Sequence, residues 1–116
     1  MSASQSQALS AIAFQLAATL DAYGVSVRRL VEQPRDAELY REVSGQVDDM
    51  RMYAAALPPL AVAWVEVLIR HFELTHGIWR LQQSGGEPVD LQRLLETLEG
   101  ASARLSRQCL QLIPSA

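Results

Sequence analysis

The sequence predicts a single all-α domain, an antiparallel four-helix bundle with up-down-up-down topology. Breaks rich in proline and glycine divide the 116 residues into four segments. Each segment is too long for a strand, and each carries apolar residues at alternating spacings of three and four. Such spacing places these side chains on one stripe of a helix that packs nearly parallel to its neighbours. The expected domain covers residues 1–116.

Four helices are expected, over residues 4–32, 36–57, 59–83 and 88–113. Their boundaries follow from prolines, because a proline inside a helix costs roughly 3 kcal/mol. Pro59 and Pro88 suit the first turns of the third and fourth helices. Gly85 and Gly86 suit the C-terminal cap of the third. The connections are short, which favours antiparallel neighbours of similar length.

Glycines inside the segments are the weak points of this assignment. Gly24 lies in the middle of the first segment, where a helix stop followed by an N-cap at Ser26 is a second interpretation. We expect the first helix to be continuous. Gly45, Gly77 and Gly100 fall away from the predicted seam, so we expect the helices to tolerate them.

The predicted core seam has 27 positions, of which only His71 and Ser102 are not apolar. The seam consists of Leu9, Ala13, Leu16, Leu20, Tyr23, Val27 and Leu30 in the first helix, Tyr40, Val43, Val47, Met50, Ala54 and Leu57 in the second, Leu60, Trp64, Val67, His71, Leu74, Ile78 and Leu81 in the third, and Leu91, Leu95, Leu98, Ser102, Leu105, Cys109 and Leu112 in the fourth.

His71 is the polar side chain that this seam is expected to bury. Aligning antiparallel helices by length places it at mid-height, near Tyr23. Burial disfavours the charged imidazolium, so we expect the pKa of His71 to fall below the roughly 6.5 of a free histidine. A buried imidazole nitrogen also needs a hydrogen-bond partner. Tyr23 is the first candidate for this partner and Ser102 the second.

No residue pattern indicates strong catalytic, metal or cofactor chemistry. Glu73 and His76 form one Glu-x-x-His pair, whereas di-iron bundles use two such pairs and two further glutamates. The other three helices contain no histidine. Cys109 is the one cysteine and falls on the core seam, where a thiol is inert. We therefore expect no metal, no cofactor and no enzymatic activity.

The composition of the chain indicates which kinds of partner and which cellular location to expect. The net charge is −3, with ten arginines and no lysine, which disfavours binding to nucleic acid or to an anionic membrane. Residues 1–10 contain no basic residue ahead of an apolar run, unlike a secretory signal peptide. The most apolar stretch, residues 54–69, contains two prolines and Glu66 and is too short to cross a bilayer. We expect a cytoplasmic protein.

The third helix carries a second apolar stripe, away from the seam. It consists of Ala61, Val65, Leu68, Phe72, Thr75 and Trp79. The neighbouring helices cannot cover all of these residues, and a contiguous patch with aromatic residues usually marks an interface. We therefore expect a homodimer in which this helix packs against its copy through Val65, Leu68, Phe72 and Trp79. A second interpretation is that the third helix is simply the most buried helix of an irregular bundle.

The predicted function is non-enzymatic and works through protein–protein contact, as in a small adaptor, a regulator or a chaperone-like subunit. The alternative is a bundle that binds an apolar ligand or cofactor between its helices, with His71 as the polar anchor. A cavity beside His71 would favour this alternative, and a filled core with an exposed apolar patch would favour protein contact.

Overall fold

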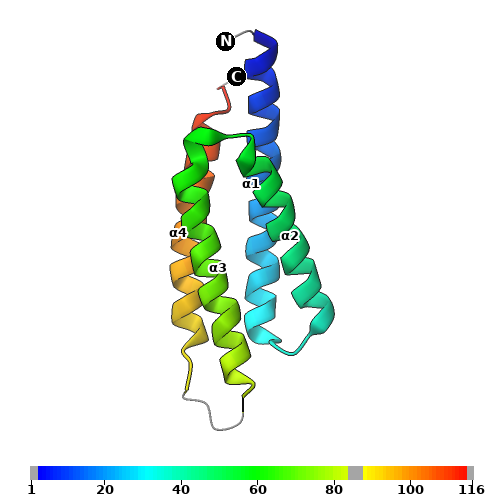
Figure 1. Cartoon of the computed structure of the whole chain (residues 1–116), viewed down its shortest axis with the longest axis vertical. Coiled ribbons are helices and arrows are strands. Elements are labelled where there is room, and N and C mark those ends of the chain that lie inside the picture. The colour runs from blue at the N-terminus through cyan, green and yellow to red at the C-terminus, as the bar shows by residue number, and fades with distance from the viewer. Residues whose placement is uncertain (1–2, 84–87, 115–116) are drawn as a thin grey trace.

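The computed structural model describes residues 3–83 and 88–114, which form an antiparallel four-helix bundle with up-down-up-down topology (Figure 1). The described residues are 87% helical and contain no strand. The elements are α1 (Ala3–Glu32), α2 (Ala37–Ala55), the short 3-10 helix η1 (Pro58–Leu60), α3 (Ala61–Leu81) and α4 (Leu91–Gln111). The predicted fold class is confirmed.

Contacts between the helices are uneven. α1 packs against both α2 and α4, and α3 packs mainly against α4. α2 and α3 touch each other much less, and their ribbons diverge toward the end that holds the α1–α2 connection (Figure 1). The bundle is therefore closed on three sides and open between α2 and α3.

α1 has the expected extent, but the helix lengths match less well than expected because α2, α3 and α4 are shorter. It has 30 residues, whereas the other three helices have 19 to 21. At 1.5 Å per residue, α1 is about 45 Å long and the others are about 30 Å long. The N-terminal part of α1 therefore extends beyond the bundle (Figure 1), where residues 3–8 are exposed.

Aspartate side chains cap the N-termini of α2 and α4. The Asp36 carboxylate accepts a hydrogen bond from the backbone N–H of Leu39 at 3.0 Å. The Asp90 carboxylate accepts one from the backbone N–H of Arg93 at 3.1 Å. Each bond satisfies an amide that has no partner within its helix.

Two expected boundaries shift because of local chemistry. α4 begins at Leu91 and not at Pro88, since the cap at Asp90 determines its start. α3 begins two residues later than expected, because Pro58–Leu60 form a 3-10 turn first. The glycines expected to cap α3, Gly85 and Gly86, lie outside the described residues.

α1 runs unbroken through Gly24, as expected. Ser26 therefore lies within the helix and does not cap one. Its hydroxyl donates to the carbonyl of Ala22 at 3.1 Å and accepts from Nε2 of Gln46 in α2 at 3.1 Å. The second interpretation, a break at Gly24, is wrong.

The predicted seam is largely buried, with shifts in register near the helix ends. Leu39 is buried in α2 where Tyr40 was expected, and Tyr40 is exposed. Ala101 is buried in α4, and Ser102 is only half-buried. Leu81 is also exposed. Spacings of three and four can alternate in either order, so an apolar residue next to the expected one can occupy the core face.

α1 is long and apolar enough to cross a membrane, with a mean hydropathy of 1.3 in its most apolar window. The core helix of a soluble bundle and an N-terminal signal sequence pass the same test. Of that window, 22% is buried in the bundle. Length and composition therefore do not assign α1 to a membrane, and its buried residues pack against α2 and α4.

Gly77 lies where α3 and α4 approach closely. A Cβ at this position would be 2.8 Å from Cδ1 of Leu94 and 3.1 Å from Cγ1 of Val89, and Gly77 is buried. A Cβ at Gly24, in contrast, would meet nothing within 4 Å. The expectation that Gly77 is merely tolerated is wrong, because the α3–α4 contact leaves little room for a larger residue.

This contrast gives a prediction for two matched substitutions. Gly24→Ala should raise the free energy of unfolding by about 0.5–1 kcal/mol, since alanine has the higher helix propensity. Gly77→Ala should show none of this gain, because the methyl group displaces Leu94 and Val89. Urea denaturation monitored by far-UV circular dichroism measures both values. Equal stabilisation by the two substitutions would contradict the close approach.

Candidate functional site

α3 presents apolar side chains on two opposite faces. Its core face buries residues that include Trp64, Val67 and Leu74. The opposite face leaves five large apolar residues exposed by about half or more, namely Val62 (83%), Val65 (49%), Ile69 (52%), Phe72 (53%) and Trp79 (56%). The exposed His76 lies between the last two. These six residues are called the outer stripe below.

The outer stripe differs slightly from the stripe expected from the sequence. Val65, Phe72 and Trp79 are exposed on the isolated chain, whereas Leu68 is half-buried at the edge of the stripe. Val62 and Ile69 complete the pattern in its place. The sequence contained this signal, since positions 62, 65, 69, 72, 76 and 79 alternate spacings of three and four. α3 does bury the largest share of its residues, but the second interpretation fails for the stripe itself, because Val65, Phe72 and Trp79 are exposed and not part of the core.

Charged side chains are segregated to one side of α3. Glu66 accepts from Nη1 of Arg104 in α4 at 2.6 Å, and Glu73 accepts from Nη1 of Arg70 at 2.8 Å. Arg70, Glu73 and Arg80 border a hollow whose other wall belongs to α4 and the segment before it. Within Ala61–Leu81, these are all of the Asp, Glu, Lys and Arg residues. The outer stripe therefore contains no carboxylate and no arginine.

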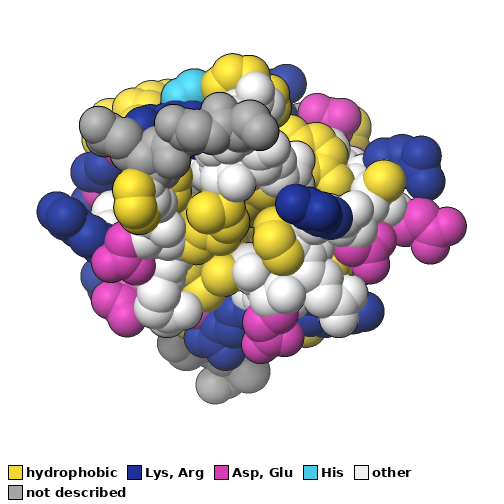
Figure 2. Space-filling model, turned by 90° about the horizontal axis from the view of Figure 1, so that it is seen from below, with side chains coloured by type: hydrophobic (Ala, Val, Ile, Leu, Met, Phe, Trp, Pro, Cys, Tyr) yellow, Lys and Arg dark blue, Asp and Glu magenta, His cyan; other side chains and the backbone are white. Residues whose placement is uncertain are grey.

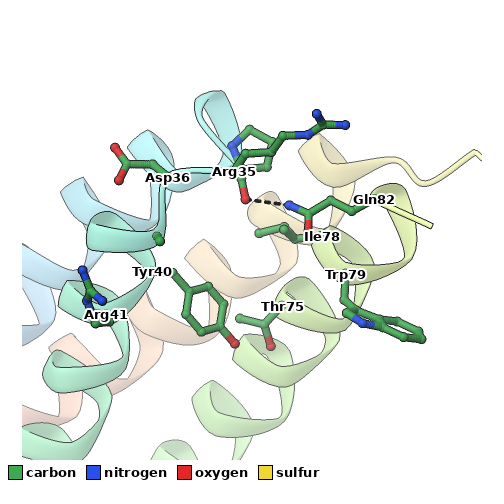
Figure 3. Close-up of a pocket in the computed structure, with 10 residues that line it drawn as sticks. Arg35, Asp36, Tyr40, Arg41, Thr75, Ile78, Trp79 and Gln82 are labelled. Carbon is green, nitrogen blue, oxygen red and sulfur yellow. Dashed lines mark hydrogen bonds between the residues drawn. The ribbon is translucent and has the colours of Figure 1, made fainter. Parts of the chain in front are cut away.

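The side of α3 that faces α2 is uncharged and borders a groove of about 740 Å³ (Figure 3). The groove lies where α2 and α3 diverge, and its lining includes Tyr40 from α2 and Thr75, Ile78 and Trp79 from α3. Tyr40 and Thr75 point toward each other across it, and the Trp79 indole points outward (Figure 3). Trp79 thus belongs both to the groove wall and to the outer stripe.

A hydrogen bond closes one end of this groove. Nε2 of Gln82 donates to the backbone carbonyl of Pro34 at 2.9 Å and links the end of α3 to the α1–α2 connection (Figure 3). The same end of the bundle shows hydrophobic side chains at the surface among polar ones, with a histidine next to them (Figure 2). Hydrophobic side chains are therefore accessible at this end of the molecule.

His71 is buried in the core, as expected, and pairs with Tyr23 of α1. The Tyr23 hydroxyl and Nδ1 of His71 are 2.9 Å apart. With the phenol as donor, the neutral imidazole keeps its proton on Nε2. Burial, and secondly the positive charge of Arg51, lowers the pKa of His71 to about 4. Burial raises the pKa of the Tyr23 phenol, so both groups are neutral near pH 7.

The second expected partner of His71 makes no such bond. Ser102 is half-buried and lines a hollow of about 300 Å³ between α1 and α4. The prediction that Ser102 lies in the core is wrong, because Ala101 occupies the core position. Nδ1 of His71 contacts the hydroxyl of Tyr23 instead.

The remaining candidate residues for chemistry occupy ordinary structural positions. Glu73 is paired with Arg70, and the His76 ring stacks on Trp79 with centroids 5.7 Å apart. Burial raises the pKa of the Cys109 thiol to about 11, which leaves it protonated and unreactive near pH 7. Residues 3–83 and 88–114 contain no group of three or more His, Cys, Asp or Glu side chains placed to hold a metal ion.

Comparison of the chain with protein families, with curated proteins and with solved structures gave no match. The outer stripe of α3 is therefore the feature of this chain from which a function is inferred.

The His71–Tyr23 pair predicts a pH dependence of stability. The pKa of His71 is about 4 in the folded chain and about 6.5 in the unfolded chain, so the unfolded state binds the proton more readily. The free energy of unfolding is therefore highest above pH 6.5. It falls by about 3 kcal/mol as the pH drops toward 4. Urea denaturation between pH 4 and pH 7 measures the loss.

The control replaces both partners, Tyr23→Phe with His71→Leu, so that no buried polar group is left unpaired. Carboxylates titrate in both proteins, and the difference between the two pH profiles isolates the imidazole. A wild-type profile parallel to that of the double variant would contradict the low pKa of His71.

Proposed function

We propose that this protein is a non-enzymatic, cytoplasmic helical module that acts through protein–protein contact and forms a homodimer through α3. The observation that carries the proposal is the outer stripe, an apolar surface without a formal acid or base other than His76. It extends about 26 Å from Val62 to Trp79, at 1.5 Å per residue. Patches of this kind that include aromatic residues mark interfaces.

The apolar surface in water favours association. Phe72 is 53% exposed and Trp79 is 56% exposed. With whole aromatic side chains of roughly 150–250 Å², the two residues leave about 200 Å² of surface in water. Removing this surface from water contributes about 5 kcal/mol per copy at 25 cal/mol per Å². Val62, Val65 and Ile69 add to this contribution, which has to exceed the entropic cost of association.

A second copy of the chain is the occupant that we propose for this surface. Two-fold dimers are the commonest closed assembly, and in them one patch meets itself. A stripe with alternating spacings of three and four suits such a contact, because it is the pattern with which two helices interdigitate. The uncharged flank formed by Leu68 and Thr75 extends the contact toward α2.

Ligand binding at His71, the alternative interpretation, lacks a favouring observation. Tyr23 occupies Nδ1 of the imidazole. None of the three hollows described above is lined by His71. The support therefore favours protein contact over a ligand held in the core.

Phe72→Glu tests the proposal. Phe72 is half exposed on one chain, so the substitution should leave the bundle folded, with an unchanged far-UV spectrum and nearly the same Tm. In the dimer it would bury a carboxylate without a partner. We expect dimerisation at least a hundredfold weaker than in the wild type, measured by sedimentation equilibrium.

The matched control is Phe14→Glu in α1, where the phenylalanine is 64% exposed and lies outside the outer stripe. It introduces the same charge at a similarly exposed position and should leave association unchanged. If Phe14→Glu dissociates the protein and Phe72→Glu does not, the interface lies on α1 and the proposal fails.

A further inference from the structure

The outer stripe has different residues in its two halves. The N-terminal half, Val62, Val65 and Ile69, is entirely β-branched and aliphatic. The C-terminal half, at positions 72, 76 and 79, is entirely ring-bearing. The intervals along the stripe are three, four, three, four and three residues, so the stripe has the same spacing when it is read from either end. A helix with this spacing can pair with a copy of itself in either direction.

The sizes of the side chains distinguish the two directions. In a parallel pair each residue meets its own copy. Three layers would then hold two small aliphatic side chains each, and the other three would hold two rings each. Helices packed in that way are wedged apart at one end. In an antiparallel pair Val62 meets Trp79, Val65 meets His76 and Ile69 meets Phe72, so every layer holds one aliphatic side chain and one ring. These layers are more similar in volume than those of a parallel pair, which allows closer packing along the whole contact.

The charges beside the stripe are compatible with this contact. Glu66 and Glu73 lie on the side of α3 that faces α4, and each is already paired with an arginine of its own chain, at 2.6 and 2.8 Å. The α2 side contributes Leu68 and Thr75, which carry no charge. An antiparallel two-fold contact brings each flank against its own copy. It therefore joins the two uncharged flanks on one side of the contact and the two charged flanks on the other, where Glu66 and Glu73 already have arginine partners.

We propose that α3 pairs antiparallel with α3 of a second copy, about a two-fold axis that passes between the two helices at the level of Arg70 and His71. The facing layers are Val62 with Trp79, Val65 with His76 and Ile69 with Phe72, each formed twice. This inference rests on the proposed homodimer and adds its direction and register. It assigns His76 to the interface as the ring that packs on Val65 of the other copy.

A charge exchange between Val65 and His76 tests the register. The two residues are eleven positions apart, about 16 Å along one helix, so their substitutes cannot pair within a chain. Both are exposed, so the fold should tolerate charges at either position. Val65→Glu alone and His76→Lys alone should each weaken dimerisation at pH 8 by at least tenfold, because each faces an uncharged residue of the other copy.

The double variant Val65→Glu with His76→Lys should dimerise at least tenfold more tightly than either single variant, because each glutamate faces a lysine across the axis. In a parallel dimer the same change would oppose glutamate to glutamate and lysine to lysine. A wild-type dimer whose double variant is no tighter than the single variants overturns the register but leaves the homodimer intact. A wild-type chain that remains monomeric overturns both. Far-UV circular dichroism of all three variants verifies that they are folded.

Disulfide trapping gives a second measurement that does not depend on charges. Val65→Cys alone should form no cross-link, since antiparallel copies hold the two sulfurs about 16 Å apart. Val65→Cys with His76→Cys should form a covalent dimer under mild oxidation. The buried Cys109 remains in both variants. Efficient cross-linking of the single variant would show a parallel pair and contradict the inference.

Discussion

The constraint on which this structure depends is that α3 carries apolar residues on opposite faces, while the bundle covers only one of them. The core face packs against the other helices and buries Trp64, Val67 and Leu74. The outer face has no neighbouring helix. α2, which lies beside its flank, diverges from α3 and leaves a groove. A chain that had to be stable only as a monomer would gain solubility from polar residues at Val65, Ile69 and Phe72.

The core contains one polar interaction whose position is compatible with this arrangement. Tyr23 of α1 and His71 of α3 bind each other and leave no charge in the core. The imidazole is thereby held at mid-height of α3, on the face opposite to the outer stripe. α1 and α3 are diagonal in the bundle, so this bond connects the two helix pairs through the centre. It contributes to the rigidity of α3.

The sequence predicted most of the fold, because long segments with spacings of three and four specify both the helices and their core faces. It predicted details less well where two neighbouring residues suit the same position. Leu39 and Tyr40 are both apolar enough for a core position. In the structure Leu39 is buried, and Tyr40 lines the groove where α2 and α3 diverge. Ala101 and Ser102 are both small, and the α4 packing selects alanine. The lack of space around Gly77 was not predicted, because it depends on Leu94 and Val89, which belong to another part of the chain.

The candidate surface was predictable in part for the same reason. Val65, Phe72 and Trp79 recur every seven residues and point away from the seam, which the sequence alone shows. Val62 and Ile69 continue the same alternation of three and four residues, but whether a neighbouring helix covers that side of α3 depends on the packing of the whole bundle. The groove beside Trp79 could not be predicted, since it results from the angle between two helices. No spacing rule encodes that angle.

The central claim is that the outer face of α3 is covered by a second copy of the chain in solution. The most direct measurement is the molar mass of the wild-type protein by light scattering over a dilution series. One chain has a mass of 12.8 kDa. A homodimer has twice this mass at high micromolar concentration, and the measured mass should fall toward that of one chain on dilution. A mass of one chain at the highest concentration would contradict it.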